Sequence, residues 1–137
     1  MEHPPGFIDM SRLAAVCADG DRVDEDLLVQ LLGLFLEDNA QRVAELTALG
    51  SATAGGEDLD GIRRAAHSLS GSCSTAGAVR LAALAKTMET EAKDGRAPAA
   101  GAIEAVSREF DAVVATLRAN YPALGSSADE ATDQAAS

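Results

Sequence analysis

The chain has 137 residues, of which 47% are hydrophobic and 3% aromatic, and its formal net charge is -11. This length allows one domain with a single core, and the scarcity of aromatic residues favours packed helices of Leu, Val, Ile and Ala over a sheet. The excess of acidic residues would repel the phosphate backbone, so no nucleic-acid partner is expected. No apolar run reaches the length of a membrane span and the start MEHPPG lacks the pattern of a secretory signal, so we expect a cytoplasmic protein with no membrane partner.

Residues 1–6 are expected to form a disordered N-terminus, because their prolines and glycine prevent regular structure. His3 lies in this segment, where nothing is expected to hold its neighbours. A short helix follows and ends at Gly20, with Asp9 or Ser11 available as its N-cap. This helix would cover part of a larger bundle.

Two longer amphipathic helices are predicted next, from apolar residues that recur at intervals of three and four. The first follows the acidic run at 24–26, which suits the positive end of a helix dipole, and ends at Gly50. A loop over residues 51–60 leads to the second helix, which Asp58 or Asp60 caps. The residues expected to face the core are Leu28, Leu31, Leu32, Phe35, Val43, Leu46, Leu49, Leu59, Ile62, Ala66, Leu69 and Cys73.

Two further helices and a tail complete the predicted order of elements. The preceding helix breaks at residues 74–77, the next ends in a basic turn before Gly95, and the last has Pro98 in its first turn. Residues 122–137 are polar and acidic without periodicity, so we expect a disordered tail. The inward residues of these two helices are Leu81, Leu84, Ala85, Met88, Ala92, Ile103, Val106, Phe110, Val113, Val114, Leu117 and Tyr121.

Together these elements predict an all-α fold, an antiparallel up-down four-helix bundle over residues 7–121 with a short additional N-terminal helix. No strand pattern and no internal repeat is visible. Cys17 and Cys73 stand 56 positions apart without the spacing of a metal or redox site, so both are interpreted as buried core residues. No metal site is predicted.

His67 is the histidine that the sequence singles out, because it lies in the run AAHSLSGSCSTAG among the smallest side chains of the chain. It is displaced by about 130° from the centre of the apolar stripe of its helix, which directs the imidazole outward. Gly71 lies one turn further on and Ser74 two turns, and a glycine inside a helix costs on the order of 1 kcal/mol relative to alanine. The small residues leave the surface around the imidazole clear, which favours contact of the ring with the active site of another macromolecule. Arg63 and Arg64, one turn before the histidine, favour an anionic group beside the ring.

The run AAHSLSGSCSTAGAVRLAALAKTME, residues 65–89, resembles the signature of histidine-containing phosphotransfer (HPt) domains. In that family a helix reads Ala-His-x-Leu-Lys-Gly-Ser, and the next helix opens with a glycine ten residues after the histidine, where this chain has Gly77. The similarity continues upstream into FLEDNAQRVAEL and covers most of residues 7–121, and the central 25 residues carry its specificity.

This resemblance implies that His67 is phosphorylated on a ring nitrogen and carries the phosphoryl group between aspartates of receiver domains in a multistep two-component phosphorelay. The partners would be receiver domains of response regulators or hybrid sensor kinases, and these domains would bring Mg²⁺ and the acid catalysis. The chain itself would need no cofactor. It would be a monomeric covalent carrier without a kinase domain, not an enzyme.

The resemblance also bears on two supporting positions. Lysine is usual three residues after the histidine, and this chain has Ser70, whose hydroxyl donates a hydrogen bond but brings no charge. Arg63 lies on a similar face and is a candidate replacement for that charge. Glu89 matches a position that faces the histidine from the next helix, whereas a simple fold-back at the predicted break would bring Leu84 closer.

Other classes of helical protein share some of these features. The dimerisation helix of a sensor kinase follows its histidine with an acid and later a proline, and Ser68 and Leu69 do not fit that pattern. A di-metal bundle needs Glu-x-x-His pairs on two helices, which one histidine in the core region cannot supply. A helical adaptor that binds a signalling partner without phosphorylation stays open as the alternative, because Ser70 in place of lysine is what decay of a phosphotransfer site would leave.

Overall fold

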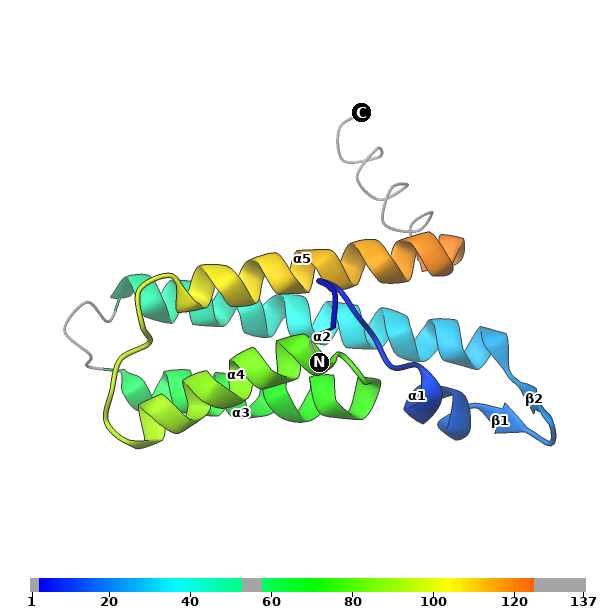
Figure 1. The fold of residues 1–137 in the computed structure, drawn as a ribbon, viewed down its shortest axis with the longest axis horizontal. Coiled ribbons are helices and arrows are strands. Elements are labelled where there is room, and N and C mark those ends of the chain that lie inside the picture. Colours follow the sequence, from blue (N-terminus) through cyan, green and yellow to red (C-terminus); the bar gives the residue numbers. More distant parts are fainter. Residues whose placement is uncertain (1–2, 53–57, 125–137) are drawn as a thin grey trace, which may run out of the picture.

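The structure is a computed structural model that describes residues 3–52 and 58–124 (Figure 1). In it, α2, α3, α4 and α5 run alternately in opposite directions, and each packs against two of the others. The predicted all-α, up-down four-helix bundle with a short N-terminal helix is therefore confirmed. The elements are α1 (Ser11–Val16), β1 (Ala18–Asp19), β2 (Arg22–Val23), α2 (Glu25–Ala52), α3 (Leu59–Ala76), α4 (Val79–Lys93) and α5 (Ala102–Asn120).

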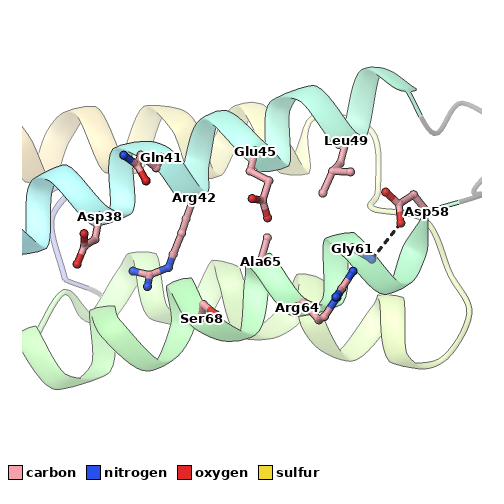
Figure 2. A pocket seen from close by; sticks show the side chains of 10 residues that line it. All are labelled: Asp38, Gln41, Arg42, Glu45, Leu49, Asp58, Gly61, Arg64, Ala65 and Ser68. Atoms are coloured by element: carbon pink, nitrogen blue, oxygen red, sulfur yellow. Dashed lines mark hydrogen bonds between the residues drawn. The ribbon is translucent and has the colours of Figure 1, made fainter.

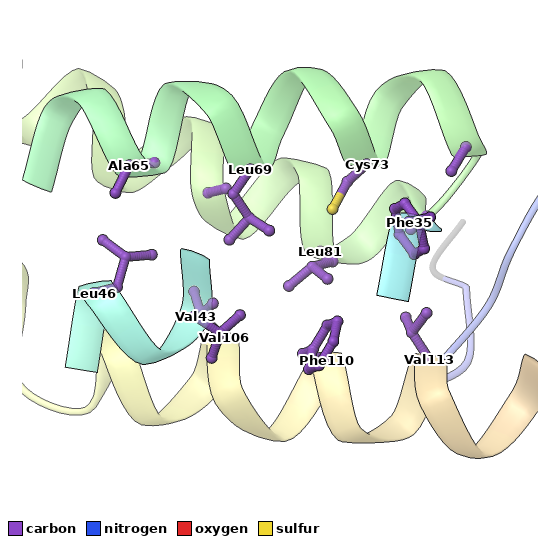
Figure 3. Close-up of a cluster of buried hydrophobic side chains, with 14 of the residues drawn as sticks. Phe35, Val43, Leu46, Ala65, Leu69, Cys73, Leu81, Val106, Phe110 and Val113 are labelled. Atoms are coloured by element: carbon purple, nitrogen blue, oxygen red, sulfur yellow. The ribbon is translucent and has the colours of Figure 1, made fainter. Parts of the chain in front are cut away.

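The core lies between the four long helices and consists mainly of aliphatic side chains (Figure 3). Every residue predicted to face inward is buried or packs against the buried cluster. Cys17 and Cys73 are buried and free, and burial raises the pKa of the Cys73 thiol to about 12, so this group stays protonated. The residues predicted to face inward that are only half-buried are Leu31, Leu49, Leu59, Leu84, Ile103, Val114 and Tyr121.

Helix α2 continues to Ala52, so the prediction that it ends at Gly50 is wrong. A side chain at position 50 would collide with Ile103 of α5, so this glycine allows the two helices to pack closely. The connection to α3 is shorter than predicted and includes residues 53–57, which lie outside the described residues. Asp58 caps α3 by accepting a hydrogen bond from the Gly61 N–H at 3.2 Å.

The N-terminal segment lies against the bundle from residue 3 onward, where we expected disorder up to residue 6. The Gly6 N–H donates a buried hydrogen bond of 2.7 Å to the Glu109 carboxylate. The His3 ring stacks on Phe7 with the ring centroids 4.1 Å apart, so this histidine does have a fixed neighbour.

The end of α1 also differs from the sequence-based expectation, because α1 stops at Val16 instead of continuing to Gly20. Residues 18–23 then form a short antiparallel hairpin in which Ala18 pairs with Val23. Gly20 supplies a positive φ of 69° at its turn. The predicted absence of strands is therefore wrong for this hairpin.

The start of α5 also differs from the prediction, because α5 begins at Ala102 and Pro98 lies in the connection before it. Gly101, with a φ of 81°, lets the chain turn into the helix. At the other end, residues 122–124 are helical and Leu124 packs against the core, although we expected the tail to begin at residue 122. The rest of the predicted tail, residues 125–137, lies outside the described residues.

The turn between α3 and α4 is formed by Gly77, because α3 continues through the predicted break to Ala76. Gly77 has a φ of 87°, and the following Ala78 N–H donates to the Cys73 carbonyl at 2.8 Å, the pattern of a left-handed helix cap. The Asp9 N–H donates to the Gly77 carbonyl at 2.8 Å, and a side chain on residue 77 would collide with the Asp9 backbone. Only glycine fits here, and the turn sets which residues of α4 face which residues of α3.

We expect Gly77→Ala to destabilise the fold more than Gly95→Ala. Gly95 also has a positive φ, 81°, but an added Cβ there meets no atom within 4 Å. Both variants incur the left-handed backbone cost of about 1–2 kcal/mol, and only Gly77→Ala adds the collision with Asp9. Urea unfolding followed by circular dichroism measures both losses, and equal losses would contradict the role given to the Asp9 contact.

Candidate functional site

His67 projects from the outer side of α3, and its side chain is 68% exposed. Its Nδ1 lies 2.7 Å from Oε2 of Glu89, which comes from α4. The turn at residues 77–78 explains the pairing, because Ala78 stands eleven positions from each partner. The alternative that a fold-back at 74–75 brings Leu84 opposite the histidine is therefore wrong.

The Glu89 carboxylate is nearly buried, with 9% of its side chain exposed, and it lies between two groups that stabilise its charge. One oxygen bonds His67, and the other lies 3.4 Å from Nζ of Lys86 on the same helix. Burial acts to raise the pKa of this carboxyl, but the bond and charge from His67 and the nearby Lys86 ammonium outweigh it, so the pKa lies below its ordinary value. Glu89 is therefore ionised at neutral pH.

The ionised carboxylate also decides which imidazole nitrogen is free. A carboxylate can only accept hydrogen bonds, so Nδ1 of His67 must carry the proton and donate it to Glu89. In the neutral ring the lone pair then lies on Nε2. Among the described residues no side chain or backbone group bonds to Nε2, so the exposed ring keeps a nucleophilic nitrogen.

Arg63 and Arg64, the two arginines predicted to assist the histidine, are both bound to Asp60. The Arg63 guanidinium lies 2.8 Å and the Arg64 guanidinium 3.3 Å from this carboxylate. The two bonds lower the pKa of Asp60, the hydrogen bond from Arg63 being the larger cause. Neither arginine makes a bond to His67, so the structure does not bring them to the ring.

Ser70 and Ser74 line a hollow of about 470 Å³ between α3 and α4, and His67 is not part of its lining. Only 8% of Ser70 is exposed. Ser74 is exposed, and its backbone carbonyl accepts a hydrogen bond of 2.7 Å from Arg12. Lys86 reaches the same hollow from α4.

Gly71 lies exposed on α3, one turn beyond the histidine. A Cβ added to it would meet no atom within 4 Å. Unlike Gly50 and Gly77, this glycine is therefore not required by packing within the described part of the chain. The open surface that it leaves lies beside the exposed ring.

Comparison with known proteins decides the family. A family model for the Hpt domain matches residues 30–120, more than half of the chain. The chain belongs to the Hpt domain family. The matched region contains His67 and Glu89, and the comparison finds no match among curated proteins or solved structures.

In this Hpt domain a groove of about 670 Å³ runs between α2 and α3 (Figure 2). Arg64 and Ser68 of α3 line it opposite Glu45 and Arg42 of α2, so both charge signs are present. Within the described residues no group of three or more His, Cys, Asp or Glu side chains is placed to hold a metal ion, and no helix is long and apolar enough to cross a membrane.

The sequence analysis missed two residues that shape this Hpt domain. Asn39 is fully buried, donates to Ser72 at 2.9 Å and accepts from Arg42 at 3.0 Å, so it ties α2 to α3. Lys86 could have been found from its spacing, because it stands one helical turn before Glu89. Asn39 gave no such signal, since its burial depends on how the helices pack.

We expect the stability of the wild-type protein to fall more steeply in acid than that of Glu89→Gln. A carboxyl whose pKa is lowered by folding stabilises the folded state above its ordinary pKa of 4.5, and this contribution is lost as the pH falls through the folded value. Glutamine has no such titration. Urea unfolding of both proteins from about pH 6 to about pH 3 tests this, and parallel losses would contradict the environment assigned to Glu89.

Proposed function

We propose that this protein is a histidine phosphocarrier of a multistep phosphorelay, which accepts a phosphoryl group on Nε2 of His67 from one receiver aspartate and donates it to another. The observation that supports this most directly is the bond between Nδ1 and Glu89, which leaves Nε2 as the free nucleophile of an exposed ring. Membership of the Hpt domain family, a phosphotransfer module without kinase activity, supports the same conclusion.

The proposed transfer needs only the groups at this surface and those of the receiver. The Nε2 lone pair attacks the phosphorus of the aspartyl phosphate, and an N–P bond forms as the P–O bond to the aspartate breaks. The released electron pair stays on the aspartate carboxylate. The proton remains on Nδ1, where the negative charge of Glu89 offsets the positive charge that develops on the ring. Donation to a second receiver is the reverse of these events, and Mg²⁺ would be held by the receiver.

The surroundings of the ring suit an approaching protein domain. His67 is exposed, and Gly71 leaves open space one turn away that no side chain of the described residues fills. Because the helices hold the ring in place, the receiver can bring its aspartate to Nε2 without a rearrangement of the bundle.

We expect His67→Gln to abolish phosphorylation and to leave the melting temperature nearly unchanged. The imidazole is largely exposed, and a glutamine amide can still donate to Glu89, so little stability is lost. Incubation with a phosphorylated receiver, followed by measurement of acid-labile label, tests the assignment. Full labelling of the variant would contradict it, and an unlabelled wild-type protein that still binds its partner would favour the unphosphorylated adaptor.

We expect Gly71→Gln to reduce transfer from a receiver far more than labelling by phosphoramidate, a small donor that needs no protein interface. The new side chain would stand on the surface that the receiver must cover. Ala119→Gln, which places the same side chain at an exposed position of α5, is the matched control and should leave both reactions unchanged. Equal losses with both donors would show that Gly71 serves the histidine geometry instead of docking.

A further inference from the structure

Phosphorylation of His67 would place a phosphoryl dianion on a ring that keeps its Nδ1 proton, a net gain of about one negative charge near a carboxylate that is already negative. Glu89 lies at bonding distance from the ring, and the whole chain carries a net charge of -11. A phosphoryl group there would meet local repulsion unless a cation lies within a few ångströms. This argument rests on the proposed function, and it raises the question of which side chain supplies that cation.

Three of the nearby cations are bound to other groups. Arg63 and Arg64 share the Asp60 carboxylate, and Arg12 donates to the carbonyl of Ser74. In the described part of the chain, none of these three arginines bonds to His67 or to its partner Glu89.

Lys86 is placed differently, because the group it bonds is the one that bonds the histidine. Its Nζ lies 3.4 Å from Oε1 of Glu89, while Oε2 of the same carboxylate lies 2.7 Å from Nδ1 of His67. One carboxylate therefore separates the ammonium from the ring. An ammonium has three N–H donors, so Lys86 can keep its bond to Glu89 and still donate to a phosphoryl oxygen. Its side chain is 65% exposed, which leaves its end free to turn toward the ring.

The hollow between α3 and α4 leaves space in which the Lys86 side chain can move. Lys86 lines the hollow together with Ser70 and Ser74, both short side chains. A long side chain at position 70, a buried position that lines the same hollow, would occupy part of this hollow. The small serine at position 70 is therefore compatible with a lysine that reaches the hollow from α4.

We propose that Lys86 of α4 is the cation that binds the phosphoryl group on His67 and offsets its charge. The lowered pKa of Glu89 agrees with an ammonium at this place: burial raises this pKa, and the bond and charge of His67, followed by the charge and bond of Lys86, lower it. The ammonium would hold Glu89 in the free protein and both Glu89 and the phosphoryl group in the phosphorylated one.

The test uses the full chain labelled with phosphoramidate, so that no receiver interface is involved. A nearby cation favours the phosphoryl dianion, so Lys86→Gln should raise the pKa of the phosphoryl group. The expected shift, measured by ³¹P NMR, is about half a pH unit, which is the effect of one exposed ion pair. The initial labelling rate should fall about threefold for the same reason. Lys86→Arg should keep both values near those of the wild type.

Arg108→Gln is the matched control, because it removes one positive charge from an exposed position of α5. The proposal expects no change in this variant. If Lys86→Gln leaves the phosphoryl pKa and the labelling rate unchanged, or if Arg108→Gln changes them equally, the role of Lys86 is overturned while the phosphocarrier function stands. If the wild-type protein itself takes no label on His67, the proposed function fails and the role of Lys86 with it.

Discussion

The left-handed turn at Gly77 is the constraint on which the site depends. The residue has a φ of 87°, and the Asp9 backbone lies where a side chain would be. The hydrogen bond from the Asp9 N–H to the Gly77 carbonyl holds the turn from outside the two helices that it joins. Because this turn sets the register of α3 against α4, it places Glu89 beside His67 at 2.7 Å.

Two opposing effects set the protonation state of Glu89, which pairs with His67. The carboxylate is nearly excluded from water, which by itself would favour its protonated form. The imidazole N–H and the Lys86 ammonium reverse that preference by bonding one oxygen each. As a result the acceptor stays charged, the tautomer of the ring is determined, and the free nitrogen lies on an exposed side chain.

The site lies on helices of the bundle, and the polar contacts that join the other elements are made by other residues. Asn39 joins α2 to α3 through Ser72, and Glu109 holds the N-terminal segment through Gly6 and also pairs with Arg80 at 3.0 Å. None of these contacts involves His67 or Glu89. The surface around the histidine is thereby left to small side chains, which suits a site that a second protein has to cover.

The helices and the outward position of His67 follow from local sequence patterns, whereas the contacts of His67 depend on how the folded helices pack. Periodic apolar residues and the glycine before α4 are local signals, and they were enough to predict the bundle and an outward His67. The partner depends on the position of the turn, because each residue by which a helical hairpin shifts its turn moves the facing position by two. That is why an earlier break at residues 74–75 pointed to the first half of α4, near Leu84, and the later turn centred on Ala78 gives Glu89. The contact of Asp9 with Gly77 and the contact of Gly50 with Ile103 are likewise set by how separate segments of the chain meet. No local pattern encodes these contacts, because their energy comes from residues that are brought together only when the chain folds.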